Sequence, residues 1–447
     1  MCIITVDVKS VIGEIKPVHS TVGVPSTSVR SEIKWKCDYY RHVSALGMPY
    51  TAFKGIGGAY GGNLFVDVNN IFRDFGADEF NPENYDFTFT DWIVRECVSR
   101  GVKPIYRLGA CKEPDHRLKA YNIYPPKDYG KFARICEHII LHYNSGWNSG
   151  YNADIKYWEI WDGPDNAREI KDNACWKGTK EEYFGFYGAV VKYLKNRFPS
   201  LLFGGYGATG FDLKDKNDYS TEFFRDFLKY VTAKRTKTPL DFFTWNSVSQ
   251  DPETNVKVAR FVRNALDGAG LTECENICGA WNSGVADPSE IKSASVIGAN
   301  LIAFQHGAVS KAMYDSCNIG APYGLFGLRI NATSVPSYGY YVIKAFDSLY
   351  KLGAWVKAES DDKEVFALAA AGLNKAGVLV VNFSDTEKET EIKTVAAKPK
   401  NATVTVIKKA NTAGLSTEEL NNIVVPQKAA GALKFTMTPN EVRLYEF

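Results

Sequence analysis

The stretch "IKYWEIWDGPDN" at residues 155–166 carries the strongest fold signal in this chain of 447 residues. Its first half is a short run of aromatic and β-branched side chains, which is typical of a buried strand. The next residues, Asp162, Gly163 and Pro164, have the composition of a turn. An amphipathic segment at 179–198 then predicts a helix. A strand followed by a turn and a helix is the repeating unit of an α/β fold.

The same alternation recurs from residue 14 to about residue 351. Eight strands that alternate with about eight helices predict a (β/α)8 TIM barrel. The alternative, a doubly wound open sheet, needs a phosphate-binding glycine turn after the first strand, and HSTVGVPST (19–27) lacks the GxGxxG spacing. The predicted strands are 15–21, 49–53, 102–109, 155–161, 201–207, 240–246, 274–281 and 300–306, and the predicted helices include 88–101, 127–143, 179–198, 220–231, 253–266 and 338–353.

The pattern changes at residue 354 to short strands separated by turn residues. This pattern predicts a C-terminal antiparallel β-sandwich over residues 354–447, after a barrel over residues 14–353. Residues 1–13 alternate like a strand, and we expect this strand to join the sandwich.

Composition excludes several classes of function. The formal net charge of +2 gives no electrostatic argument for a nucleic acid or an anionic membrane as partner.

The N-terminus lacks the apolar stretch of a signal peptide, and we expect a cytoplasmic protein. The nine cysteines lack the spacing of a zinc site, and the pair His138 and His142 lacks the glutamate of HExxH, so we expect no metal or cofactor.

Two motifs resemble those of one enzyme family. "YWEIWDGPD" (157–165) resembles the strand-four motif of glycoside hydrolase family 39, the β-xylosidase and α-L-iduronidase family of clan A, which reads close to YWEIWNEPD. "ENICGAWNS" (275–283) is similar to the strand-seven motif of that family, in which a Glu precedes Trp-Asn. The likeness extends to residues 66–94, 135–147 and 184–199. The resemblance implies a β-xylosidase-like ancestry.

The resemblance also implies that both catalytic carboxylates are replaced. The acid/base Glu corresponds to Gly163, the Asn before it to Asp162, and the nucleophile to Ala280. Retaining glycosidases need one carboxyl group to protonate the leaving oxygen and a second to attack the sugar carbon. Neither Gly nor Ala can protonate the leaving oxygen or attack the sugar carbon, so the resemblance implies that no catalytic carboxylate of the family is retained.

Residues expected around the sugar are replaced as well. At strand two the family pattern Arg-x-His-Asp corresponds to Ala52, Lys54 and Gly55, and at strand six an expected His corresponds to Asn246. At strand one, HGVNNGP is replaced by residues 19–25. The replacements therefore gather at the strand ends that form the mouth of the barrel.

Other side chains at the strand ends are candidates for binding or for relocated chemistry. Asp162 and Asp315 are candidate substitute carboxylates, although Asp162 is also typical of a loop hydrogen bond to backbone. Glu159 is expected in a buried polar pair or in the cleft. The indoles at strand ends either stack on a sugar or close the barrel as core. The predicted substrate-binding residues are Trp161, Trp245, Asn246, Trp281, Asn282, Tyr314 and Lys54.

Three hypotheses about function follow. The first is a pseudo-enzyme that binds carbohydrate or partners an active homologue, as a homo-oligomer or a hetero-oligomer. The second is an active glycosidase on a xyloside-type substrate that uses Asp162 or Asp315. The third is a structural barrel whose cleft is filled by side chains.

Overall fold

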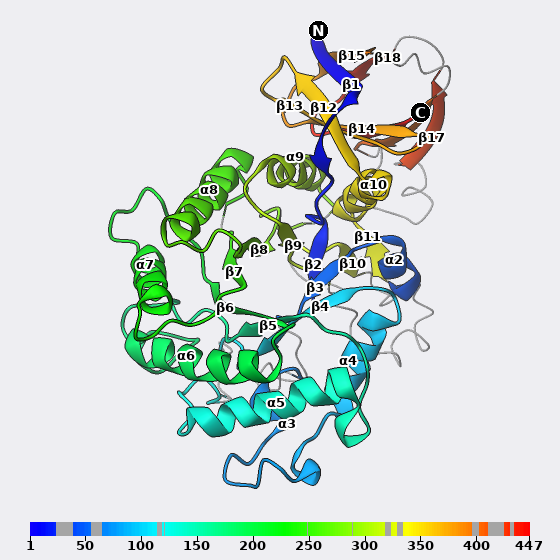
Figure 1. Ribbon diagram of the computed structural model, residues 1–447. Coiled ribbons are helices and arrows are strands. Elements are labelled where there is room, and N and C mark those ends of the chain that lie inside the picture. The colour runs from blue at the N-terminus through cyan, green and yellow to red at the C-terminus, as the bar shows by residue number, and fades with distance from the viewer. Residues whose placement is uncertain are drawn as a thin grey trace.

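The computed structural model of the protein describes residues 1–23, 39–54, 65–113, 119, 121–247, 249–287, 289–317, 323–328, 334–395, 402–409, 424–429 and 433–447. Within these ranges, eight parallel strands close into a barrel in chain order (Figure 1). The predicted TIM barrel is therefore confirmed. The barrel strands are β2 (Ser20–Val22), β3 (Tyr50–Ala52), β4 (Lys103–Leu108), β5 (Tyr157–Ile160), β6 (Leu202–Ala208), β7 (Phe242–Asn246), β8 (Glu275–Trp281) and β9 (Lys311–Tyr314).

Helices surround the barrel, and several of them begin at capping side chains. In the helix that starts at Lys180, Thr179 accepts the backbone N–H of Glu182, whose side chain accepts that of Thr179. Asp128, Asp218 and Asp251 cap three other helices. The helices are α2 (Tyr39–Ala45), α3 (Val68–Ile71), α4 (Thr88–Val98), α5 (Tyr129–Ser145), α6 (Lys180–Arg197), α7 (Tyr219–Thr232), α8 (Pro252–Gly268), α9 (Lys292–His306) and α10 (Tyr338–Leu352), with 3-10 turns at Pro82–Asn84 and Trp147–Ser149.

The prediction of a strand at 300–306 is wrong. These residues form the second half of α9 (Lys292–His306), and the eighth barrel strand is β9 (Lys311–Tyr314). The helix packs against α8, α10 and the C-terminal sheet, so nearly all of its side chains are buried. A helix that is apolar all round shows no polar face, and its sequence therefore resembles that of a buried strand.

The remaining long strands form one nine-stranded sheet beside α9 and α10 (Figure 1). The N-terminal strand β1 (Cys2–Glu14) lies inside it, antiparallel to β12 (Ala354–Ser360) and parallel to β15 (Lys388–Val395). The sheet is consistent with the predicted β-sandwich, and this one pairing makes it mixed. Its other strands are β13 (Val365–Ala371), β14 (Ala376–Asn382), β16 (Ala402–Ile407), β17 (Val424–Ala429), β18 (Leu433–Met437) and β19 (Val442–Glu446); a small hairpin joins β10 (Phe326–Leu328) to β11 (Ser334–Pro336).

Strand β14 joins the two parts of the molecule because both of its faces are buried. Val378 and Val380 belong to the core of the sheet domain. Leu379 and Val381 point the other way and belong to the core that the barrel shares with its helices. Side chains alternate between the two faces of a strand, so one strand contributes to both cores.

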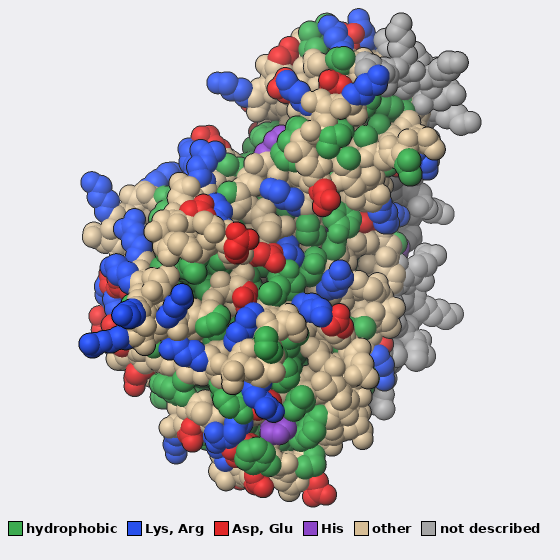
Figure 2. Space-filling model, in the orientation of Figure 1, with side chains coloured by type: hydrophobic (Ala, Val, Ile, Leu, Met, Phe, Trp, Pro, Cys, Tyr) green, Lys and Arg blue, Asp and Glu red, His purple; other side chains and the backbone are tan. Residues whose placement is uncertain are grey.

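No helix within the described ranges is long and apolar enough to cross a membrane. On the face shown in Figure 2, Lys and Arg side chains are interspersed with Asp and Glu, in agreement with the small net charge.

We predict that Leu379→Ala destabilises the protein far more than Leu373→Ala does. Leu379 is fully buried between the sheet and the barrel helices, whereas Leu373 is fully exposed in the turn before β14. A buried Leu→Ala change costs about 2–5 kcal/mol because it leaves a cavity. Urea denaturation measures both variants, and equal stability of the two would contradict the packing described here.

Candidate functional site

The ammonium of Lys54 lies at the centre of the barrel mouth. Lys54 follows β3, and its Nζ is 3.3 Å from Oδ1 of Asp162 and 3.9 Å from Oε2 of Glu159, both from the β5 region. The same ammonium donates a hydrogen bond to Oδ1 of Asn246 at the end of β7, at 3.3 Å. Side chains of three barrel strands therefore meet at one lysine.

Two glycines leave room for this ammonium. Gly207 on β6 has a φ of +63°, and a Cβ there would lie 2.4 Å from Oδ1 of Asp162 and 3.0 Å from Nζ of Lys54. A Cβ on Gly279 of β8 would lie 3.3 Å from the same Nζ. The lysine side chain thus reaches from β3 across the mouth to β6 and β8.

The charges around Lys54 keep it protonated. Burial lowers the pKa of the amine, but the carboxylates of Asp162 and Glu159 outweigh that effect, and the pKa is raised. The residue is only 8% exposed. A buried ammonium is stable only when carboxylates pair with it, and these two provide the pairing.

Glu159 is held inside the barrel beneath this ammonium. Burial raises the pKa of its carboxyl group, and the charge of Lys54 opposes the rise. The hydroxyl of Thr244 donates to Oε1 of Glu159, and the backbone N–H of Gly207 donates to that hydroxyl at 3.0 Å. The structure places Glu159 in a buried polar pair.

Asp162 is approached by a second buried cation. Nη1 of Arg107 lies 3.8 Å from Oδ2 of Asp162. The guanidinium also forms an ion pair with Asp67 and donates to the sulfur of Cys111. Arg107, Asp67 and Thr244 were not among the predicted site residues, although Arg107 stands at a strand end.

The backbone at Gly163, which the sequence resemblance aligns with the acid/base Glu, has a conformation that disfavours any side chain. Gly163 has a φ of +62°, in the left-handed region. A Cβ there would lie 3.0 Å from Cγ2 of Thr209 and 3.3 Å from Sγ of Cys175. A glutamate at this position would therefore need both a strained backbone, at a cost of roughly 1–2 kcal/mol, and movement of its neighbours.

The position that the sequence resemblance aligns with the nucleophile faces the barrel interior with only a methyl group. Ala280 lies on β8 opposite Asn246 in the strand register and packs against the interior cluster. Its carbonyl accepts the backbone N–H of Ser247 at 2.8 Å. Nothing at this position can attack a sugar carbon.

Asp315 is the other candidate carboxyl group. It follows β9, and burial raises its pKa, which the charge of Lys54 opposes and that of Asp162 reinforces. Among the predicted residues, the structure brings Lys54, Asp162 and Asn246 into direct contact, and Asp315 interacts with Lys54 and Asp162 through their charges.

The indoles predicted to stack on a sugar are buried in the layer between the barrel and its helices. Trp161, Trp245 and Trp281 are 1%, 0% and 1% exposed. The Nε1 atoms of Trp161 and Trp245 donate to the carbonyl of Cys175 and to Asn276, each at 2.8 Å. All three side chains belong to the main hydrophobic core, so the prediction that they stack on a ligand is corrected to a core role.

Two further predicted binding residues also have structural partners. Tyr314 is buried, and its hydroxyl donates to the carbonyl of Tyr323 at 2.6 Å. Oδ1 of Asn282 accepts the backbone N–H of Gly284 at 2.8 Å, which closes the loop after β8. Gly55, which corresponds to the family Asp, lies outside the described residues.

A cavity of about 540 Å³ lies beside the loops that follow β4 and β5. Tyr121 and Tyr124 line it and are 68% and 54% exposed. Exposed tyrosine rings at a cavity of this size offer flat apolar faces together with hydroxyl groups. Within the described part of the chain, no three His, Cys, Asp or Glu side chains gather as a metal site.

We expect Lys54→Met to lower the free energy of unfolding by about 3–5 kcal/mol at neutral pH, because it leaves Asp162 and Glu159 without their ammonium. Unpaired carboxylates bind protons more readily, so the loss shrinks as the pH falls. Urea denaturation across pH measures this. The exposed Lys192 of α6 is the matched control. A loss as small as that of Lys192→Met would contradict the network.

The carboxyl group of Asp165 provides a separate test, through the pH dependence of the protein's stability. Its carboxylate accepts the backbone N–H of Thr209 at 3.1 and 3.2 Å, and burial raises its pKa to about 7 against opposing hydrogen bonds. The pKa of an unfolded Asp is about 3.9, so the stability contributed by its proton is complete below that value and is lost as the pH rises through about 7.

The Asp165→Asn variant removes this titration. We therefore expect it to be more stable than the parent at alkaline pH by an amount on the order of 2–4 kcal/mol, and little different at about pH 4. Thermal denaturation over this range measures the difference. Asp215→Asn, in an exposed loop, is the control. A constant difference across pH would show that Asp165 is ionised throughout.

The sequence and the fold were compared with known proteins. Residues 3–259 match the family described as glycosyl hydrolases family 39. A beta-xylosidase of Geobacillus stearothermophilus is 26% identical over 190 residues, which cover 41% of this chain and 34% of that protein. The match to this curated relative thus spans about a third of its length.

Two solved structures share the whole architecture. A glucosidase from Croceicoccus marinus superposes with a TM-score of 0.76 at 19% identity, over 100% of this chain and 98% of that one. A monomeric beta-xylosidase from Caulobacter crescentus CB15 gives a TM-score of 0.71 at 16% identity, over 99% of both chains. These two structures establish the fold. Because the family match covers more than half of the 447 residues, this chain belongs to family 39 of the glycosyl hydrolases.

Proposed function

We propose that this chain is a non-hydrolysing member of family 39 that binds carbohydrate or acts as the partner of an active homologue. The observation that carries the proposal is the position of the Lys54 ammonium. It lies within ion-pair distance of Glu159 and of Asp162, the residue before Gly163, and 3.3 Å from where a Cβ on Gly279, the residue before Ala280, would lie.

The Lys54 ammonium occupies the region where retaining hydrolysis would need space for a positively charged sugar. Retaining hydrolysis passes through a sugar with cationic, oxocarbenium-like character held between two carboxyl groups. Here a permanent cation is already paired with carboxylates at the mouth. A sugar that entered this position would have to displace Lys54 and leave Asp162 and Glu159 unpaired, which costs several kcal/mol.

Carbohydrate binding would then occur beside the mouth. The cavity lined by Tyr121 and Tyr124 lies next to the loops after β4 and β5 and offers exposed rings on which a sugar face can stack. If the function is instead that of a partner, the C-terminal sheet domain offers a surface that is separate from the mouth.

A second candidate function is hydrolysis by relocated carboxyl groups. Burial and the charge of Asp162 raise the pKa of Asp315, which suits a general acid, while Asp162 faces the cations Lys54 and Arg107 and would serve as the nucleophile. Xyloside-type substrates are the class implied by the family. This candidate requires Lys54 to leave Asp162 during the reaction.

Hydrolysis of aryl glycosides separates the two candidates. We expect the purified protein to release no 4-nitrophenol from β-xyloside, β-glucoside or α-arabinofuranoside substrates above the uncatalysed rate. Restoring both carboxylates in Gly163→Glu/Ala280→Glu should leave the protein inactive, because the Gly163 backbone is left-handed and Lys54 still occupies the mouth. Turnover by the parent that Asp162→Asn or Asp315→Asn abolishes would overturn the proposal and establish the second candidate.

A further inference from the structure

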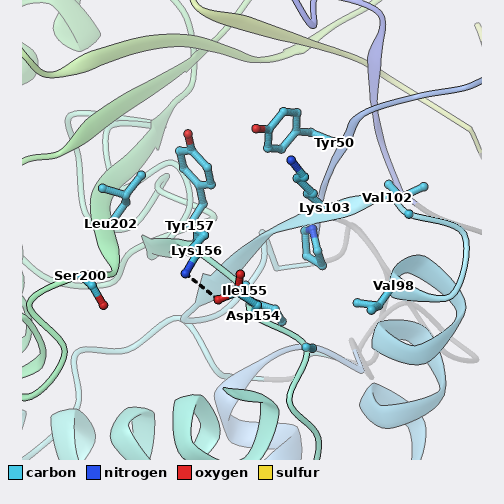
Figure 3. Close-up of a pocket in the computed structure, with 13 residues that line it drawn as sticks. Tyr50, Val98, Val102, Lys103, Asp154, Ile155, Lys156, Tyr157, Ser200 and Leu202 are labelled. Carbon is cyan, nitrogen blue, oxygen red and sulfur yellow. Dashed lines mark ion pairs between the residues drawn. The ribbon is translucent and has the colours of Figure 1, made fainter. Parts of the chain in front are cut away.

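We infer that the opposite end of the barrel carries a second binding site, for a small aromatic carboxylate. A cavity of about 490 Å³ lies at the N-terminal ends of the strands, far from the Lys54 network. Figure 3 shows side chains from the start of β4, the end of α4, the segment before β5 and the start of β6 around it. Its volume lies within the range of small-molecule sites.

The walls of this cavity are apolar and aromatic. Tyr50 and Tyr157 meet edge to face, with ring centroids 5.8 Å apart and an interplanar angle of 88°. Val102, Pro104 and Leu202 line the cavity with them. Two perpendicular rings beside aliphatic side chains provide the surroundings that a flat ring prefers.

A second lysine, Lys311, lies against the two tyrosine rings, but it does not line the cavity and its charge is balanced. Its ammonium lies 4.8 Å from the Tyr157 ring centroid and forms an ion pair with Glu275. The hydroxyls of Tyr157 and Ser310 also donate to Glu275, at 2.7 and 3.0 Å. This balanced pair does not select the charge of a ligand.

The rim carries a cation that is not balanced. The Lys103 ammonium lies 5.7 Å from the centroid of the Tyr50 ring and points toward it in Figure 3. Among the described residues, no carboxylate lies within ion-pair distance of Lys103, whereas its neighbour Lys156 is paired with Asp154 at 2.5 Å. A ligand carboxylate at the rim would pair with Lys103 while its ring lies against Tyr50.

The negative charge of an aromatic carboxylate distinguishes it from a neutral ligand such as a sugar. A neutral sugar would gain no ion pair with the exposed Lys103 and would place hydroxyl groups against Val102, Pro104 and Leu202, whose side chains offer no hydrogen bond. An aromatic carboxylate uses the rings, the aliphatic wall and the cation together. The N-terminal face of a TIM barrel does not carry the catalytic groups, so this site is independent of the mouth and of the proposed function.

The test is calorimetric titration with 2-naphthoate and with 2-naphthalenemethanol, which has the same ring system without the charge. We expect the carboxylate to bind at a single site and the alcohol to bind at least about fivefold more weakly. Lys103→Gln should weaken naphthoate about fivefold to tenfold and leave the alcohol unchanged. Lys103 is exposed, so the fold should survive the change.

Lys192→Gln, on the exposed face of α6, is the matched control and should bind naphthoate like the parent. Ala153→Phe fills the cavity from its wall and should abolish binding of both compounds, with circular dichroism confirming the fold. Absence of binding at millimolar naphthoate, equal affinity for acid and alcohol, or equal loss in the Lys103 and Lys192 variants would each overturn the inference.

Discussion

The ion pair between Lys54 and Asp162 is the interaction on which the barrel mouth depends. A lysine buried at the centre of a barrel needs carboxylates, and Asp162 and Glu159 supply them. The pairing in turn requires Gly207 to have no side chain, because a Cβ there would collide with Asp162 and crowd Lys54. Lys54, Asp162, Glu159 and Gly207 therefore belong to one arrangement whose parts depend on each other.

Gly163 and Ala280, which the sequence resemblance aligns with the two catalytic glutamates of the family, lie next in sequence to residues that border the Lys54 ammonium. Gly163 has a left-handed backbone, and Ala280 faces the barrel interior with a methyl group. The network beneath, with Arg107 against Asp67 and Thr244 against Glu159, keeps the mouth polar and occupied. The rest of the barrel keeps the family fold because its hydrophobic core lies between the strands and the helices, away from the mouth.

The sequence alone predicts the barrel, since turn composition after "YWEIW" and the helical periodicity at 179–198 depend on local chemistry. The prediction from sequence fails at α9, because burial on all sides removes the alternation of apolar and polar residues that marks a helix. It also misplaces Trp161, because β5 ends at Ile160 and the left-handed backbone of Trp161, with a φ of +75°, breaks the alternation of side chains that the sequence suggests. The network at Lys54 joins β3, β5 and β7, and Lys54 is separated from each of its partners by more than a hundred residues, so only the fold reveals it.

The most direct test of the Lys54 arrangement is binding of a xylose-configured iminosugar, whose protonated ring nitrogen is a cation of the kind that retaining glycosidases stabilise. Calorimetry should compare the parent with Lys54→Ala. If the ammonium of Lys54 occupies the mouth, the parent does not bind the iminosugar, and the variant gains binding because the ligand nitrogen pairs with Asp162 and Glu159. Equal binding to both proteins would show that the mouth is free for a sugar and would contradict the account.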